Sequence, residues 1–226
     1  MWVNVNDGIV NATLTNNTNT QTLAADSGRG IMVDLGNAVN ATLTITGNAF
    51  SNLLNQGLLV NGFASFTGTA NITFNTNTFT NVGQSAVNAT ASGLFFDQSG
   101  QSGATMTVRM QNNNINVGNT STSALAAAFC FRNFPTAGDT PRLNITAVNN
   151  TFSTAGTHSF RGQDAFASIT CFDIRSADFS GDTAQLLINP GTTFNIYEDA
   201  SNTVNPIPNV GAGTKTPIAI NTCPKP

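Results

Sequence analysis

Three charged side chains, two of them carboxylates that could perform acid–base chemistry, recur at one position of a sequence repeat: Asp97, Arg132 and Asp173. Each follows two apolar residues, Phe-Phe or Cys-Phe, so equivalent strands in neighbouring repeats would place the three side chains in one outward column. Two carboxylates on adjacent strands can act as acid and base in glycosidic-bond cleavage, or can bind calcium. The competing interpretation is an exposed ion-pair ladder, which contributes little to stability.

The three cysteines, Cys130, Cys171 and Cys223, permit one disulfide and leave one thiol. Cys130 and Cys171 occupy the same position in two repeats. Stacking would bring their Cα atoms to about 4.8 Å, within reach of a disulfide, but with unfavourable parallel Cβ vectors. We favour a bridge from Cys223 to either of them, which would hold the C-terminal segment against the stack. Three thiols with a single histidine in the chain are a poor metal site, so we expect no metal and no cofactor.

The element that must position these residues is a pair of strands that recurs along the chain. Residues 70–79, Ala-Asn-Ile-Thr-Phe-Asn-Thr-Asn-Thr-Phe, alternate apolar and polar side chains as in a strand with one buried face, and then end in Asn-x-Phe. Similar endings close other repeats. A second apolar strand precedes each ending, at residues 32–34, 59–61, 95–97, 130–132 and 171–173. A repeat of roughly 27 to 41 residues with two strands predicts a solenoid of stacked parallel coils.

Stacking would turn each repeated position into a column of equivalent side chains. The expected polar column consists of Asn48, Asn77, Asn113 and Asn150. The expected apolar column beside it consists of Phe50, Phe79, Ile115, Phe152 and Phe194. Stacked side-chain amides can hydrogen-bond along the solenoid, because each amide carries both donors and an acceptor.

Asparagine and phenylalanine columns at the corners of stacked coils resemble the right-handed parallel β-helices of the pectin-lyase type. The Asn- and Thr-rich, charge-poor composition resembles bacterial surface β-helix proteins such as autotransporter passengers and large adhesins. This resemblance implies an all-β fold, a single-stranded right-handed parallel β-helix of about six coils over residues 1–194. Residues 195–226, which are rich in proline, are expected to form a tail that caps the last coil.

The outward face of the second strand carries a threonine-rich array. The threonines expected in one column are Thr15, Thr44, Thr73, Thr107 and Thr146. A flat, regular lattice of hydroxyl and methyl groups resembles the ice-binding faces of some β-solenoids. The alternative is that threonine is simply favoured on exposed strands.

The overall charge is low. Charged residues make up 8% of the 226 residues and the formal net charge is −3, so no basic surface for nucleic acid is expected. No uninterrupted apolar run approaches the roughly 18 residues of a membrane span, and no export signal is visible. The scarcity of lysine and glutamate nevertheless suggests a piece of a larger exported protein, located outside the cell or on its outer surface.

These observations favour a non-enzymatic structural or adhesive module of a bacterial surface protein. Its loops would bind a glycan or a host surface protein, and the rods could assemble end to end. The longer loops at residues 98–103, 135–141 and 154–164 are the expected contact surfaces. A polysaccharide lyase or hydrolase is the first alternative, although the motifs Asn-Thr-Asp, Asp-Asp, Gly-His-Gly and Arg-Ile-Lys of pectinolytic enzymes are absent from the sequence. An ice-binding protein is the second alternative.

Overall fold

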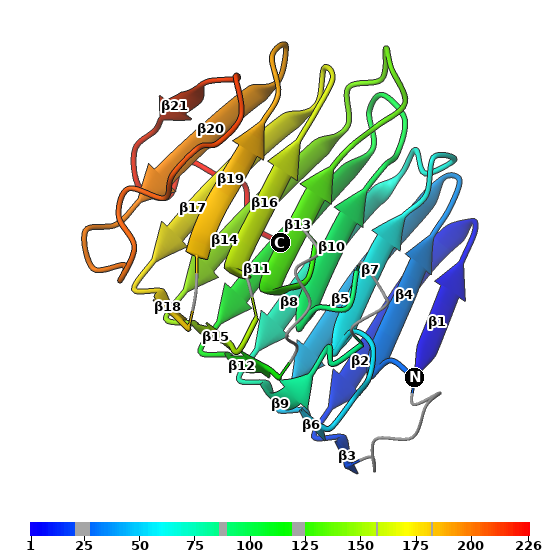
Figure 1. The fold of residues 1–226 in the computed structure, drawn as a ribbon. Coiled ribbons are helices and arrows are strands. Elements are labelled where there is room, and N and C mark those ends of the chain that lie inside the picture. Colours follow the sequence, from blue (N-terminus) through cyan, green and yellow to red (C-terminus); the bar gives the residue numbers. More distant parts are fainter. Residues whose placement is uncertain (21–27, 86–89, 119–124, 157, 182) are drawn as a thin grey trace.

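The structure is a computed structural model that describes residues 1–20, 28–85, 90–118, 125–156, 158–181 and 183–226, and this part of the chain contains strands and no helix. The strands form three sheets that run along the molecule from the N-terminal to the C-terminal coil (Figure 1). The first sheet contains β1 (Trp2–Val5), β4 (Ile31–Leu35), β7 (Leu58–Gly62), β10 (Leu94–Gln98), β13 (Ala127–Asn133), β16 (His158–Asp164) and β19 (Thr183–Ile188).

The second sheet contains β2 (Gly8–Thr15), β5 (Val39–Thr46), β8 (Thr69–Asn75), β11 (Thr105–Gln111), β14 (Arg142–Val148), β17 (Ile169–Arg175), β20 (Thr193–Glu198) and β21 (Lys215–Pro217). The third sheet contains β3 (Thr18–Thr20), β6 (Ala49–Ser51), β9 (Thr78–Val82), β12 (Asn114–Val117), β15 (Thr151–Thr154) and β18 (Asp178–Ser180).

Each coil contributes one strand to each sheet in turn, and every strand pair in the described residues is parallel. Six coils are complete, and β19 and β20 begin a seventh. The predicted all-β parallel β-helix is therefore confirmed. The boundary expected at residue 194 falls within β20, so the coiled part extends to Glu198.

The corner between the second and third sheets has the same backbone conformation in every coil. The residue at this corner has a positive φ in each complete coil: Asn16, Gly47, Thr76, Asn112, Asn149 and Ser176. Glycine and asparagine adopt this left-handed conformation at little cost, whereas threonine and serine do so only when the surroundings require it. The corner is therefore imposed by the stack and does not depend on one residue type.

An asparagine ladder follows this corner. The Nδ2 atoms of Asn48, Asn77 and Asn113 donate to the Oδ1 atom of the ladder residue in the next coil, at 2.9, 3.1 and 2.8 Å. The same Nδ2 atoms also donate to a backbone carbonyl of the preceding coil, and the backbone amides of the three residues donate along the stack. Because these amides are buried, nearly every polar atom of the ladder is satisfied inside the protein. The predicted column from Asn48 to Asn150 is thus confirmed.

The ladder is longer than the sequence indicated. It starts at Asn17, whose Nδ2 donates to Asn48 Oδ1 at 2.8 Å, and Ala177 interrupts it in the sixth coil. Beyond this gap the backbone amide of Ala177 donates to Asn202 Oδ1 at 2.9 Å, so a residue of the C-terminal segment continues the ladder. Neither Asn17 nor Asn202 has a phenylalanine two residues later, so neither forms an Asn-x-Phe ending. The repeat pattern therefore did not reveal them.

The apolar column of the third sheet differs from the prediction in its last member. Phe50, Phe79, Ile115 and Phe152 are stacked as expected, but the next residue is Phe179. Phe194 lies in the second sheet, where it pairs with Thr170. Its side chain is buried all the same.

The cause of this error is the sixth coil. Its first-sheet strand is β16, where Phe131 of the previous coil is followed by Gly162 and not by Phe172. The segment 171–173 belongs to β17 of the second sheet, where Phe172 pairs with Ile145. Strands of both sheets alternate with the same period of two, so residue pattern alone could not tell them apart.

A group of polar side chains interrupts the apolar interior. In the register of the first sheet, Leu35 is followed by Gly62, Gln98, Asn133 and Asp164, and the last three are fully buried. Asp164 Oδ1 accepts a hydrogen bond from Ser168. Among the described residues, Asp164 Oδ2 and Asn133 Oδ1 have no donor. Burial raises the pKa of Asp164 to about 7, and a proton on its carboxyl group would supply a donor at this point.

The ladder predicts a loss of stability for Asn77→Ala. This substitution removes the acceptor of the buried backbone amide of Asn48, one acceptor of its side-chain amide, and a donor to the Ile45 carbonyl of the preceding coil. We expect the free energy of unfolding to fall by about 2 kcal/mol, measured by urea denaturation. Asn114→Ala, at the exposed position directly after the ladder residue Asn113 of the next coil, should change it by less than about 0.5 kcal/mol. Equal effects of both substitutions would contradict a structural role of the ladder.

The buried carboxyl group predicts a pH dependence of stability. Burial raises the pKa of Asp164 from its ordinary value of 3.8 to about 7 in the folded protein, so between these pH values the folded state retains a proton that the unfolded chain has released. The contribution of Asp164 to the free energy of unfolding is therefore fully present below about pH 4 and is lost as the pH rises to about 7. Urea denaturation across this range should show a flatter profile for Asp164→Asn. The control Asp7→Asn, at an exposed aspartate, should retain the wild-type dependence of stability on pH. If Asp164→Asn also retained the wild-type dependence, Asp164 would not be the group that causes it.

Candidate functional site

The polar column on the outer face of the first sheet contains the first two of the three predicted site residues. Asp97 on β10 pairs with Arg132 on β13. Arg132 Nε donates to Asp97 Oδ1 at 3.0 Å, and its Nη2 atom contacts Asp97 Oδ2. Ser99 Oγ donates to the same carboxylate at 3.1 Å, and the guanidinium of Arg132 lies 5.8 Å from the centre of the Phe95 ring. The Asp97 carboxylate is therefore engaged on both oxygens.

Asp173 is not part of this column, contrary to the prediction. The position after Arg132 in the register is occupied by Gln163, whose amide cannot act as an acid or a base. Asp173 lies on β17 of the second sheet, between Thr146 and Tyr197. The structure thus places the two carboxylates of the expected acid–base pair on different sheets.

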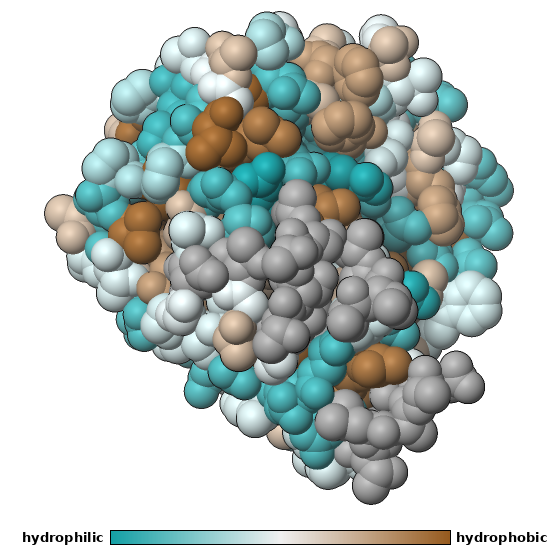
Figure 2. All heavy atoms as spheres, viewed as in Figure 1, coloured by the Kyte–Doolittle hydropathy of each residue, from teal (hydrophilic) through white to brown (hydrophobic). Residues whose placement is uncertain are grey.

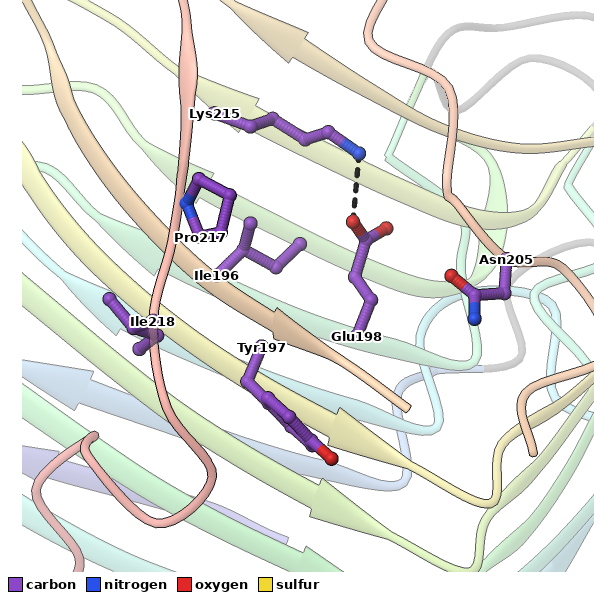
Figure 3. A pocket seen from close by; sticks show the side chains of 7 residues that line it. All are labelled: Ile196, Tyr197, Glu198, Asn205, Lys215, Pro217 and Ile218. Atoms are coloured by element: carbon purple, nitrogen blue, oxygen red, sulfur yellow. Dashed lines mark hydrogen bonds and ion pairs between the residues drawn. The ribbon is translucent and has the colours of Figure 1, made fainter. Parts of the chain in front are cut away.

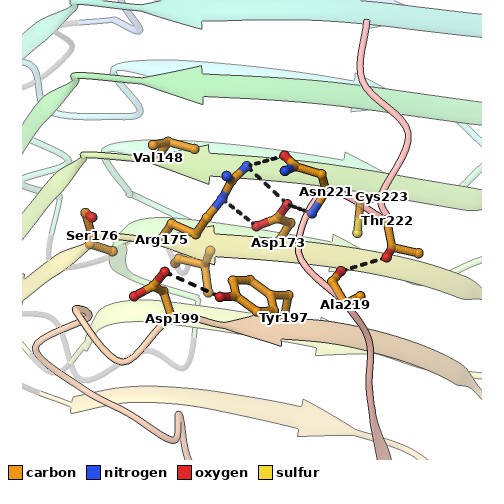
Figure 4. A network of polar contacts seen from close by, with 12 residues as sticks. Val148, Asp173, Arg175, Ser176, Tyr197, Asp199, Ala219, Asn221, Thr222 and Cys223 are labelled. Atoms are coloured by element: carbon orange, nitrogen blue, oxygen red, sulfur yellow. Dashed lines mark hydrogen bonds and ion pairs between the residues drawn. The ribbon is translucent and has the colours of Figure 1, made fainter.

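Asp173 takes part in a polar network that ties the C-terminal segment to the second sheet (Figure 4). Arg175 Nε lies 2.9 Å from Asp173 Oδ1. Asn221 joins both residues, because its backbone amide donates to Asp173 Oδ2 and its Oδ1 atom accepts from Arg175 Nη2, each at 3.2 Å. Like Asp97, Asp173 is neutralised by an arginine.

The disulfide lies next to this network. Cys171 is bonded to Cys223, and Cys130 is a free, buried thiol. The favoured pairing of Cys223 with one of the other cysteines is confirmed. A bridge between Cys130 and Cys171 is excluded, because Cys130 pairs in the register with Arg161, while Cys171 lies in the second sheet between Asn144 and Asn195.

The C-terminal segment closes the end of the solenoid on all three sheets. The amide of Leu186 on β19 donates to the carbonyl of Pro208, β21 pairs with β20, and the amide of Thr203 donates to the carbonyl of Ala177 beside β18. Ile207 is fully buried in the core. Residues 199–217 therefore cap the last coil, and they lie within the segment 195–226 for which the sequence predicted this role.

A pocket of about 390 Å³ lies between β20, β21 and Asn205 (Figure 3). Its charged residues are already paired, since Lys215 Nζ donates to Glu198 Oε2 at 2.8 Å and to the carbonyl of Ile207 at 2.8 Å. Glu198 Oε1 accepts the backbone amide of Ile207. These contacts hold the cap in place, which identifies the pair as a structural one.

The threonine array does not have the predicted register. Thr44 and Thr73 are paired, but the next residue of this column is Arg109, followed by Thr146 and Asp173. Thr15 and Thr107 belong to the columns on either side, where they pair with Thr46 and Asn71. The five threonines expected in one column therefore lie in three, and Thr107 and Thr146 are buried. On this face, the uninterrupted threonine column consists of Thr13, Thr44 and Thr73 in the first three coils, and the columns beside it contain asparagines.

Two further features bear on the class of site. In the described part of the chain, no three His, Cys, Asp or Glu side chains are grouped in a way that could hold a metal ion. The described residues also contain no helix with the length and apolarity that a membrane crossing requires.

The disulfide predicts that reduction destabilises the cap. The bond closes a segment with a sequence separation of 52, so its loss should lower the free energy of unfolding by about 4 kcal/mol in the chain-entropy description. Urea denaturation with and without dithiothreitol measures this difference. Cys130→Ala should retain the full effect of the reductant, whereas Cys223→Ser should abolish it. A wild-type protein that is insensitive to the reductant would contradict a stabilising role of the bond.

The chain matches no protein-family model, and searches against curated proteins and solved structures return no match either. The description of the molecule as a parallel β-solenoid therefore follows from its own strand pairing.

Proposed function

We propose that this chain is a non-enzymatic structural and adhesive module of the bacterial surface, of the type found in autotransporter passengers and adhesins. The observation that carries the proposal is the separation of Asp97 from Asp173. They lie on different sheets, and each is bound to an arginine. A polysaccharide lyase or hydrolase built on these residues would need both carboxylates in one groove, with one of them free to exchange a proton.

An extracellular location is supported by the disulfide and by the composition. Disulfides persist in oxidising compartments, and the bond between Cys171 and Cys223 fixes the cap to the second sheet. Charged residues make up only 8% of the chain. On the face seen in Figure 2, hydrophilic and neutral residues predominate and hydrophobic residues occur in small groups. Such a surface remains soluble without a large net charge.

The contact surface of this module would be the corner between the first and second sheets. Phe63, Phe134 and Phe166 follow first-sheet strands in three coils, and we call them the aromatic edge. Phe63 and Phe166 are 41% and 44% exposed, and the rings of Phe134 and Phe166 are 5.3 Å apart. Exposed aromatic rings on a rigid scaffold are typical contacts for sugar rings and for protein partners.

The loops beside the aromatic edge are held in place. Ser102 donates through its backbone amide and its hydroxyl to Asp139 Oδ1, at 3.0 and 3.1 Å, and thereby joins the loops that follow β10 and β13. These loops include two of the three that the sequence predicted as contact surfaces. The third, residues 154–164, consists largely of β16. The cap occupies the last coil, so end-to-end assembly would not use that end of the solenoid.

The proposal predicts that binding depends on the aromatic edge and not on Asp97. Glycan and surface-protein arrays should detect binding without product release, and Phe166→Ala should weaken it by about tenfold. Val210→Ala, which truncates a still more exposed apolar side chain of the cap (56% against 44% for Phe166), should leave binding unchanged.

Product release would overturn the non-enzymatic assignment. If reducing or unsaturated ends appear and are abolished by Asp97→Asn, the enzyme alternative is correct. Binding that survives Phe166→Ala would instead move the contact surface away from the aromatic edge.

A further inference from the structure

The aromatic edge lies in a column that alternates between small and aromatic side chains. The residue that follows each first-sheet strand donates its backbone amide to the carbonyl at the end of the equivalent strand in the preceding coil, at 2.9 to 3.1 Å. These hydrogen bonds place one residue of each coil in register. From the second coil to the sixth, the column consists of Gly36, Phe63, Ser99, Phe134 and Ala165. Two phenylalanines are therefore separated by a single coil, which carries a serine.

The rings of Phe63 and Phe134 face outward at a fixed spacing. The two residues are two coils apart, which corresponds to about 9.6 Å at about 4.8 Å per coil. Gly62 and Asn133, which precede them, belong to the interior column of the first sheet, so the alternation along a strand directs both rings outward. Phe63 is exposed and Phe134 is half-buried. Ser99 has a short side chain, so the column has no ring in the coil between them.

Phe166 supports the ring of Phe134 from the sixth coil. The two ring centres are 5.3 Å apart and the ring planes are inclined by 79°, an edge-to-face arrangement that aromatic pairs favour. Phe166 has a φ of 59°, which is rare for a bulky residue and costs free energy. The strained residue is nevertheless 44% exposed, so the strain does not serve to bury the ring. Such strain is typical of binding surfaces.

The loops at this corner carry almost no charge. They comprise residues 63–68, 99–104, 134–141 and 165–168. Asp139 is the one charged residue among them, and its carboxylate accepts hydrogen bonds from Ser102. Thr67, Gln101 and Thr136 are exposed, and their hydroxyl and amide groups can both donate and accept hydrogen bonds. A neutral ligand rich in hydroxyl groups complements this surface, whereas an acidic ligand would meet a carboxylate and no cation in these loops.

We propose that the aromatic edge binds a neutral β-1,4-linked glycan whose chain runs along the solenoid axis, an inference that rests on the adhesive function proposed above. In an extended β-1,4-linked chain each sugar is turned over relative to the one before it. The same ring face therefore recurs at every second sugar, over a length close to two coils. The first and third sugars stack on Phe63 and Phe134, and the second sugar spans Ser99.

A proline-rich peptide is a poorer match for the same rings. Peptides of this class dock into grooves lined by aromatic side chains. The aromatic edge lies instead on an outer corner of the solenoid, where the stacked loops present separate rings. A sugar ring needs one flat apolar face for each contact, which is what each phenylalanine offers.

The test is isothermal titration calorimetry of the full chain with cello-oligosaccharides of two, three and four glucose units. A disaccharide reaches only one of the two rings, so the affinity should rise at least about tenfold from the disaccharide to the trisaccharide. Phe63→Ala should remove this rise. The matched control Ile220→Ala, which truncates a similarly exposed apolar side chain of the C-terminal segment (46% against 41% for Phe63), should retain it.

Several outcomes would overturn this inference. Equal affinities for all three lengths, or a rise that survives Phe63→Ala, would exclude stacking on two rings. Binding of an α-1,4-linked malto-oligosaccharide or of an acidic oligogalacturonate as tight as that of the cello-oligosaccharide would exclude selection by linkage or by charge. If Phe63→Ala does not fold, Phe63→Leu removes the ring and retains an apolar side chain. Unchanged trisaccharide binding by this variant would likewise exclude stacking.

Failure of this inference can be told apart from failure of the proposed function. A protein, a proline-rich peptide or another glycan that binds through Phe166, without binding of cello-oligosaccharides, would make the β-1,4-glycan assignment wrong and leave the adhesive function standing. The absence of binding to any glycan or surface protein would contradict both.

Discussion

The hydrogen bonding between coils is the constraint on which the rest of this structure depends. Each strand between the edges of its sheet pairs with the coil before it and the coil after it, so a change of register in one coil would propagate to the others. The asparagine ladder fixes this register at one corner, since each buried amide must meet the amide of the next coil. The positive φ values at the preceding position show that even Thr76 and Ser176 conform to it.

This constraint also explains why the ends and corners differ from the middle. Loops that leave the stack can vary in length, because only the strands take part in the ladder of hydrogen bonds. The last coil lacks a following coil, and residues 199–217 supply the missing partners for all three sheets. The disulfide at Cys223 and the network around Asp173 then hold this cap on the second sheet.

Polar residues in unusual places mark where the molecule departs from a purely repetitive rod. Asp164 lies in the apolar interior, and Arg161, three residues earlier on the same strand, lies buried on the outer face. Both residues belong to the sixth coil, whose first-sheet strand lacks the apolar pair of the earlier coils. A structural repeat does not require charges at these positions, and their burial is costly. The sixth coil is therefore the part of the solenoid most specialised for something other than stacking.

The sequence by itself determined the fold class, the ladder from Asn48 to Asn150, and the capping role of the C-terminal segment. These features depend on local alternation and on spacing, which are visible along the chain. Only the tertiary structure decided which strands share a sheet. It placed Asp173, Phe172 and Cys171 in the second sheet, put Phe179 in the column assigned to Phe194, and divided the threonines among three columns. The physical reason is that strands of different sheets have the same period of two. The sheet to which a strand belongs is set by the lengths of the loops and by pairing with neighbouring coils. No local pattern of residue types along the sequence encodes this assignment.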